Sequence, residues 1–260
     1  MDTVDLRVDA RGVAWLTLNR PDKHNAMSGQ MIDEITATAA RLGRDPAVRV
    51  VVLGANGPSF CAGGDLGWMR DQMQADAATR AREASKLADM LGTLDRMPKP
   101  LIGRIHGQAF GGGVGMMSVC DVAIGATGAK FGLTETKLGL IPATIGPYVV
   151  ARMGAARARR VFMSARIFDA SEAVDLGLLA RAVDAGALDA AIEAEIVPYL
   201  ACAPGAVADA KALIAKLDPR VTDATVAMTI DALVRRWESE EAQEGIAAFF
   251  DKRKANWVDS

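Results

Sequence analysis

The segment AFGGGVGMMSVCD, residues 109–121, places three consecutive glycines before a fourth, Gly115. Glycines at a junction between a strand and a helix let a ligand approach main-chain N–H groups, and a helix that starts there adds a partial positive charge. Such a place suits an anion. Tight packing of the backbone is the alternative explanation for so many glycines, and this segment alone leaves both explanations open.

Two nucleotide-binding motifs can be compared with these glycines. A phosphate-binding P-loop is excluded because neither Lys-Ser nor Lys-Thr follows them. Gly113-Val114-Gly115 imitates the first half of a dinucleotide fingerprint, and Glu135 lies at about the right distance for a ribose contact. However, Ser118 stands in place of the third glycine, and the motif lies in mid-chain without a clean strand–helix–strand unit.

Apolar periodicity predicts alternating strands and helices in the first part of the chain. We expect a hairpin over residues 4–18, a helix capped by Ser28, a buried strand over 48–54 and a long helix ended by Pro98. The segment 55–65, between the last two, is expected to break regular structure.

The order of two strands and a helix then returns, and the chain is expected to be mainly helical from about residue 146. The predicted elements of this part are a strand over 100–107, a short buried helix over 115–120, paired strands over 121–126 and 129–133, a helix capped by Ser171, a brief strand over 178–183 and amphipathic helices between 187 and 255.

The composition predicts a soluble globule. Half of the 260 residues are apolar, so the chain can bury a large core. Three widely spaced cysteines and two histidines argue against a disulfide framework and a zinc site, so reduced thiols in a cytoplasm are expected. No stretch approaches the roughly twenty apolar residues of a membrane span. A net charge of −2 gives no general attraction to nucleic acid.

Three longer motifs stand in order along the chain: FCAGGDL at 60–66, HGQAFGGGVG at 106–115 and FGLTETKLGLIP at 131–142. Together they resemble the crotonase, or enoyl-CoA hydratase/isomerase, family. The resemblance runs from NRPDKHNAM at 19–27 to AFFDKRKANW at 248–257, which is nearly the whole chain.

This resemblance implies an α/β fold, a crotonase-type spiral of repeated ββα units with a C-terminal helical oligomerisation region. We expect a core with the acyl-CoA site over 1–195 and the helical region over 196–260. The resemblance also implies trimers or dimers of trimers, acyl-CoA thioester substrates, and no metal or redox cofactor, since coenzyme A is part of the substrate. No nucleic acid or membrane partner is expected.

By the same resemblance, the main-chain N–H groups of Gly64 and Gly112 form an oxyanion hole for the thioester carbonyl. Rigid backbone donors stabilise an enolate without reorganising. The positions that hold coenzyme A in relatives are matched here by Lys23, His24, Ala26, Ala62, Asp65, Leu66, Phe249 and Lys252. The alternatives are a solvated surface position for Lys23, and helix packing and solubility for the two C-terminal residues, which a neighbouring subunit could also contribute.

Glu135 falls where relatives carry a catalytic glutamate. The second glutamate of hydratases stands two residues beyond the last of the three glycines, and here that position is Gly115. The scheme with one water between two carboxylates therefore does not carry over intact. Either Glu135 supports hydration with a water held by backbone or by Thr144, or it shuttles a proton alone as an isomerase. At the substrate site, Gly115 leaves room for a branched substrate or marks a changed mechanism.

The segments GGGVGMMSVCDVAIGA and GLIPATIGPYVVARMG most resemble the bacterial methylglutaconyl-CoA hydratase-like branch of this family. This favours hydration of 3-methylglutaconyl-CoA or a related branched enoyl-CoA, in leucine or acyclic-terpene breakdown. Such substrates bear a distal carboxylate, for which the candidate cations are Arg70, Lys137 and Arg152.

A catalytically inactive CoA-binding protein is the main rival to an enzyme because one carboxylate is missing. RNA binding is disfavoured by the acidic balance and by the lack of a basic stripe with interleaved aromatic residues. A serine hydrolase is disfavoured because no GxSxG elbow occurs. His106, at the end of a predicted strand, is interpreted as structural.

Overall fold

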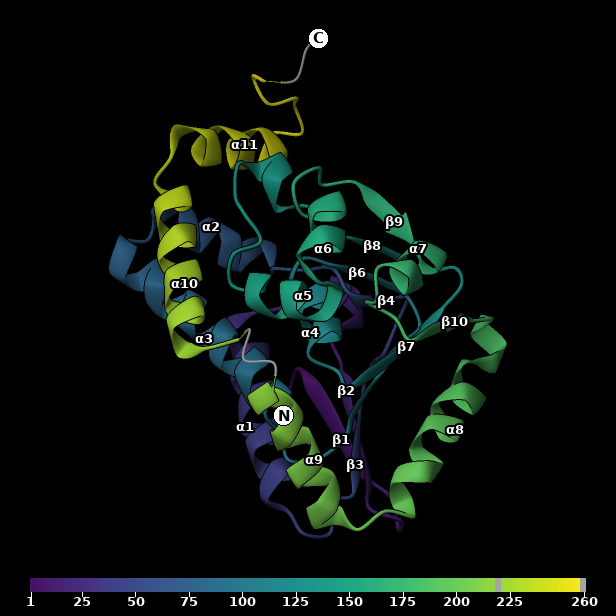
Figure 1. Cartoon of the computed structure of the whole chain (residues 1–260). Helices are drawn as coiled ribbons and strands as arrows, with labels where there is room; N and C mark the ends of the chain where they lie inside the picture. Colours follow the sequence, from purple (N-terminus) through teal and green to yellow (C-terminus); the bar gives the residue numbers. More distant parts are fainter. Residues whose placement is uncertain (218–220, 258–260) are drawn as a thin grey trace.

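The chain folds into two mainly parallel β-sheets covered by helices (Figure 1). The computed structural model describes residues 1–217 and 221–257. The larger sheet contains, in spatial order, β1 (Val4–Val8), β2 (Val13–Leu18), β3 (Val50–Ala55), β5 (Leu101–Ile105), β7 (Val122–Ala126) and β10 (Arg181–Val183). The smaller sheet contains β4 (Ser59–Cys61), β6 (Gln108–Phe110), β8 (Lys130–Gly132) and β9 (Ile167–Asp169).

Each turn of the fold adds one strand to each sheet before the chain becomes helical. β3 is followed by β4, β5 by β6 and β7 by β8, and the first strand of each pair joins the larger sheet. Strands from successive turns pair in parallel, because helical segments return the chain to the same end of the sheets. The predicted spiral of ββα units is confirmed.

The helices begin where the sequence offers caps and apolar faces. The Ser28 hydroxyl accepts a hydrogen bond from the Met31 N–H at the start of α1, as predicted. The α-helices are α1 (Gly29–Arg44), α2 (Leu66–Gln74), α3 (Ala77–Asp95), α4 (Gly112–Ser118), α5 (Gly146–Met153), α6 (Ala155–Phe162), α7 (Ala170–Asp175), α8 (Leu188–Leu200), α9 (Pro204–Leu217), α10 (Asp223–Trp237) and α11 (Glu240–Phe250). The 3₁₀ turns are η1 (Pro21–Lys23), η2 (Glu135–Leu138) and η3 (Ala185–Ala187).

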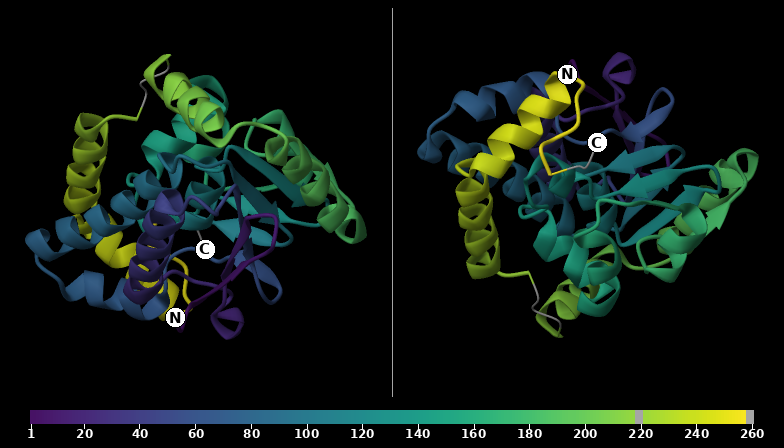
Figure 2. Two further views of the ribbon diagram at one scale, coloured as in Figure 1. Left: turned by 90° about the horizontal axis from the view of Figure 1, so that it is seen from below. Right: turned by 90° about the horizontal axis from the view of Figure 1, so that it is seen from above.

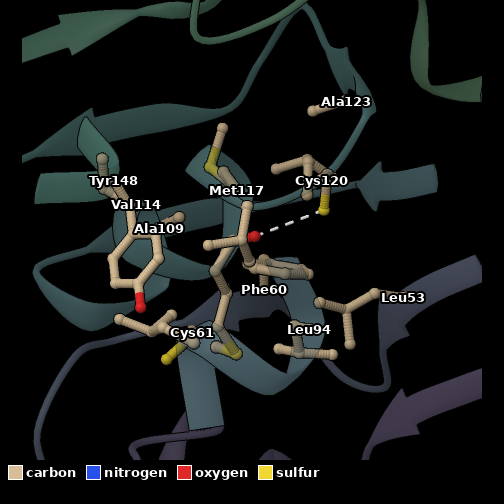
Figure 3. Close-up of a cluster of buried hydrophobic side chains, with 14 of the residues drawn as sticks. Leu53, Phe60, Cys61, Leu94, Ala109, Val114, Met117, Cys120, Ala123 and Tyr148 are labelled. Atoms are coloured by element: carbon tan, nitrogen blue, oxygen red, sulfur yellow. Dashed lines mark hydrogen bonds between the residues drawn. The ribbon is translucent and has the colours of Figure 1, made fainter. Parts of the chain in front are cut away.

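The main core lies where the two sheets, α3 and α4 meet, and Figure 3 shows part of it. Phe60 is fully buried there beside Leu53 and Met117. Cys61 and Cys120 are also buried, and burial raises the pKa of both thiols to about 12. These two thiols are therefore neutral packing groups.

The C-terminal helices cover different parts of the core. α8 packs on the larger sheet through Ile192 and Ile196, which form a buried cluster with Val50 and Ile102. In both views of Figure 2, α8 lies on the side opposite α10 and α11. The predicted division after residue 195 falls inside α8, so this helix belongs with the sheet on both sides of that point. A division of the chain into two regions stays a prediction.

Three local expectations differ from the structure. Residues 121–126 and 129–133 do not pair, because β7 joins the larger sheet and β8 the smaller one. The segment 55–65 is not wholly irregular, since β4 pairs in parallel with β6. Asp169, and not Ser171, caps α7, because its carboxylate accepts the Glu172 N–H at 2.9 Å.

No single helix among the described residues is long and apolar enough to cross a membrane. One strongly bent pair, residues 185–200 with 204–217, passes the same test by length and composition only.

Candidate functional site

A cavity of about 490 Å³ lies between several parts of the chain. Most of its walls come from the loop after β4 with the start of α2, the start of α4, the segment from η2 to the start of α5, and helices α10 and α11, and other elements add single residues such as Leu87 of α3. Glu135 and Lys137 are the charged side chains among these described wall residues. The rest of the lining is largely apolar, including Leu87, Leu138, Leu140, Ile141, Leu233 and Trp237.

Two glycine backbones form one wall of this cavity. Met27 donates its N–H to the Gly63 carbonyl at 2.8 Å and accepts the Asp65 N–H at 3.0 Å, which places Gly64 between these two bonds. Gly112 is the first residue of α4, where a backbone N–H has no acceptor within the helix. Because Gly64 and Gly112 both line the cavity, the structure brings together the two predicted oxyanion donors.

The neighbouring glycines have different reasons to be glycine. Gly111 has φ +49°, and a Cβ there would lie 3.0 Å from Oε1 of Glu135. A Cβ on Gly112 would overlap the terminal methyl group of Met27. Gly113 packs on the β4 backbone, since a Cβ there would lie 2.8 Å from the Cys61 carbonyl oxygen. Tight packing therefore explains Gly113, whereas Gly111 makes room for the glutamate.

Glu135 is the first residue of η2, and its carboxylate is largely shielded from solvent. Its Oε2 is buried without a hydrogen-bond partner in the described part of the chain. Burial raises the pKa of this carboxyl from its ordinary value of 4.5 to about 7. A carboxyl that titrates near neutral pH beside backbone donors is suited to accept and return a proton.

The C-terminal helices hold the Glu135 segment from outside. Arg236 on α10 donates from Nε to the Gly139 carbonyl at 2.8 Å. Gly245 on α11 permits backbone contact with η2, because a Cβ there would lie 2.7 Å from the carbonyl carbon of Leu138. Figure 1 shows α11 lying across this end of the molecule. The predicted helical extension thus positions the catalytic candidate of its own chain.

The position of the second glutamate is filled by an apolar side chain. A Cβ on Gly115 would lie 2.6 Å from Cγ2 of Ile145, and Gly115 is absent from the described cavity walls. The expectation that Gly115 leaves room for a branched substrate is therefore wrong at this point, because Ile145 takes that space. Thr144, the residue before it, lines the cavity with its Oγ1 buried and unpartnered among the described residues.

The predicted coenzyme A residues lie on two adjacent loops and at the C-terminal end. The loop after η1 runs beside the loop after β4, where Ala62 donates its N–H to the His24 carbonyl at 3.0 Å. Arg20 joins the loops by donating to the Ala26 carbonyl at 2.7 Å and pairing with Asp65 at 3.1 Å. Of the predicted residues, those in the cavity wall are Ala62, Leu66 and Phe249, and those outside it are Lys23, His24, Ala26, Asp65 and Lys252.

Asp65 and His24 also have structural contacts. The Asp65 carboxylate caps α2 by accepting the Gly67 and Trp68 N–H groups. The Nδ1 of His24 lies 2.9 Å from the Ser59 hydroxyl. Their predicted roles in binding coenzyme A remain predictions.

The three candidate cations lie in different surroundings. Lys137 lines the cavity. The Arg70 guanidinium lies 4.4 Å from the ring centroid of Phe250, and Arg152 donates to main-chain carbonyls, including that of Ser118 at 3.1 Å. Lys137 is therefore the cation of the three that a ligand in the cavity would meet.

His106 and metal binding need only brief comment. The Nε2 of His106 lies 2.8 Å from the Gly57 carbonyl oxygen, and burial lowers the pKa of this histidine. This contact agrees with a structural role. Within residues 1–217 and 221–257, no group of three or more His, Cys, Asp or Glu side chains could hold a metal ion.

Several wall residues carry no signal in the sequence that could have identified them. Met27 closes the space beside Gly112, and Trp68, Leu233 and Trp237 line the cavity from α2 and α10. In the sequence they read as ordinary apolar positions of a loop and two amphipathic helices. Leu233 and Trp237 reach the cavity through the tertiary packing of α10, which local sequence patterns do not predict.

Comparison with known proteins agrees with this geometry. The family model described as enoyl-CoA hydratase/isomerase matches residues 9–260. A crotonyl-CoA hydratase of Syntrophomonas wolfei is 32% identical over 257 residues, which cover 95% of this chain and 94% of the relative. A probable enoyl-CoA hydratase of Bacillus subtilis is 31% identical over 261 residues, 98% of each chain.

The solved structures agree as well. The crystal structure of an enoyl-CoA hydratase from Mycobacterium avium superposes with a TM-score of 0.89 at 32% identity, covering 99% of this chain and 100% of the other. The family model and the relatives cover both glycine loops, η2 and the C-terminal helices. The chain is an enzyme of the enoyl-CoA hydratase/isomerase, or crotonase, family.

Proposed function

We propose that this chain adds water across the α,β double bond of enoyl-CoA thioesters. The observation that carries the proposal is the Glu135 carboxylate in an apolar cavity that Gly64 and Gly112 also line, with its Oε2 buried and unpartnered among the described residues. Two relatives named as hydratases, which are 31% and 32% identical to this chain over nearly its whole length, support hydration as the reaction.

In the proposed reaction, the thioester oxygen accepts hydrogen bonds from the Gly64 and Gly112 N–H groups. The water oxygen bonds to Cβ while one of its protons passes to the Glu135 carboxylate, and the negative charge moves to the thioester oxygen as an enolate. Glu135 then returns that proton to Cα, so one water is added in total. The two backbone donors stabilise the enolate because they are fixed before charge develops. Coenzyme A enters as part of the substrate, and the proposed steps use no metal or redox cofactor.

A second candidate is isomerisation of the double bond, in which Glu135 moves a proton between two carbons. The observation that favours it is the replacement of the second carboxylate by Gly115 and Ile145. Incubation with crotonyl-CoA and branched enoyl-CoAs in heavy-oxygen water, followed by mass spectrometry, separates the candidates. Hydration gives a product that is heavier by one labelled water. An unlabelled positional isomer would support isomerisation, and binding without turnover would support an inactive CoA-binding protein.

For the acyl group, we propose a branched enoyl chain such as that of 3-methylglutaconyl-CoA, as in leucine or acyclic-terpene breakdown. The apolar lining supports a branched hydrocarbon, and the presence of Lys137 in the cavity wall supports a substrate with a distal carboxylate. Lys137→Met should raise KM for 3-methylglutaconyl-CoA about tenfold, the scale of one charge-assisted contact, and leave KM for uncharged 3-methylcrotonyl-CoA unchanged. Lys130→Met, at an exposed position of β8 outside the cavity wall, is the control. An equal rise in KM for both substrates would contradict the proposed contact between Lys137 and the distal carboxylate.

We also propose that the chain works in the cytoplasm as a trimer or a dimer of trimers. The exposed apolar side chains of α9, among them Leu213, Ile214 and Leu217, support self-association. Sedimentation of the purified chain tests this, and a monomer at micromolar concentration would contradict it.

A further inference from the structure

Two unpartnered oxygens belong to residues that line the same cavity. Four buried side-chain polar atoms lack a hydrogen-bond partner in the described parts of the chain: Trp15 Nε1, His106 Nδ1, Glu135 Oε2 and Thr144 Oγ1. Of these four residues, only Glu135 and Thr144 line the cavity. An unsatisfied buried polar group is costly, so each of these two oxygens is a candidate to form a hydrogen bond with a polar ligand in the cavity.

The main chain fixes Thr144 in its place. The Ala143 N–H donates to the Ile141 carbonyl at 2.8 Å, and the Gly146 N–H donates to the Ala143 carbonyl at 2.9 Å. Ile145 packs on Gly115, and Thr144 itself is 4% exposed. The hydroxyl group therefore belongs to a rigid turn at the entrance to α5.

The Thr144 hydroxyl is the polar group that remains beside the lost carboxylate. Ile145 fills the space next to Gly115, so no carboxylate fits there without displacing it. The other polar side chains in the wall lie elsewhere: Thr134, Glu135 and Lys137 belong to η2 or its N-cap, and the Trp68 Nε1 donates to Glu83 at 3.4 Å. Among the described wall residues, the Thr144 hydroxyl is thus the side-chain hydrogen-bonding group between α4 and α5.

We propose that Thr144 Oγ1 holds the water that adds to Cβ, and so takes over the positioning part of the missing second carboxylate. This proposal rests on the proposed hydration. Thr144 accepts a hydrogen bond from the water proton that is not transferred, while the other proton points to Glu135. Thr144 gains and loses no proton in the reaction. It is a water-positioning residue, and Glu135 remains the group that moves the proton.

The test separates addition of water from removal of a proton. Thr144→Val keeps the shape of the side chain and removes the hydroxyl, whereas Thr144→Ser keeps the hydroxyl. Two rates are measured for each variant and for Glu135→Gln: hydration of crotonyl-CoA, and exchange of the α proton of butyryl-CoA in deuterated water. Exchange needs Glu135 and the oxyanion donors but needs no water at Cβ.

We expect Thr144→Val to lose about 10- to 100-fold in kcat for hydration, the scale of one hydrogen bond to the reacting water. Its exchange rate should stay within about threefold of the wild type, because that reaction does not use the bond. Thr144→Ser should recover most of the hydration, and Glu135→Gln should lose both reactions. Equal losses of hydration and exchange in Thr144→Val, or full hydration by this variant, would overturn the proposal. If the wild-type chain exchanges the α proton but never forms a hydrate, the proposed hydration itself fails.

Discussion

Two walls of the same cavity carry opposite chemistry. The wall built on η2 holds the Glu135 carboxylate, with a pKa raised to about 7 by burial, and Gly111 leaves space for it. The wall where α4 meets α5 is formed by Thr144 and Ile145, and the Ile145 methyl group packs on Gly115 behind it. In the proposed reaction the proton chemistry is therefore concentrated in one carboxylate, and the described residues of the other wall contribute only neutral groups.

The largest effect on catalysis should come from replacing Glu135 in the wall built on η2. Glu135→Gln keeps the size of the side chain but cannot accept a proton, so hydration should fall by about 10²- to 10⁴-fold in kcat. Binding of a saturated acyl-CoA, measured by calorimetry, should change little because the amide still fits. Retention of most of the activity would move the proton chemistry to another residue and abolish the contrast between the two walls.

A smaller loss of kcat should follow when the proposed oxyanion donor Gly112 is displaced. Gly112→Ala forces the new Cβ against the terminal methyl group of Met27, so either the Met27 side chain or the start of α4 must shift. We expect kcat to fall by up to about 10²-fold, somewhat less than complete removal of one oxyanion donor. The double variant Met27→Ala/Gly112→Ala gives the Cβ its space and should recover part of the activity. If the double variant is no better than Gly112→Ala, the loss has a cause other than this contact.

The apolar wall should give the smallest effect on catalysis. Gly115→Glu alone must displace Ile145, so it should destabilise the fold by about 1–3 kcal/mol and leave crotonyl-CoA hydration no faster. The double variant Gly115→Glu/Ile145→Gly makes room for the carboxylate, and hydration by it should no longer depend on the Thr144 hydroxyl. Thermal unfolding and kcat, with Ile145→Gly as the control, measure both effects. A gain in activity by Gly115→Glu alone, without loss of stability, would show that the wall is not filled.

The contrast also shows what the sequence can predict. The hairpin over 4–18, the cap at Ser28 and the buried strand predicted over 48–54 depend on local alternation and capping. All are present, and the strand is observed as β3, Val50–Ala55. The assignment of β7 and β8 to different sheets depends on pairing with strands of other turns, so local pattern suggested the wrong partner.

The same distinction applies to the site. The family motifs predicted the Glu135 wall, and the structure places Gly64, Gly112 and Glu135 around one cavity. The contact between Gly115 and Ile145 joins residues thirty positions apart in the sequence. Motif spacing does not predict which distant side chain occupies the space beside a glycine. The part of the site that the sequence left open is therefore the part that depends on tertiary packing.

The most direct test of a single proton-carrying carboxylate is the pH dependence of kcat/KM for hydration by the wild-type chain. Glu135 must be ionised to accept the water proton, so the rate should rise about tenfold per pH unit below its pKa and level off above it. The account predicts one ionisation with a midpoint near the raised pKa of Glu135, about 7. A bell-shaped profile with two ionisations would contradict the account, because it would reveal a second titrating group in the reaction.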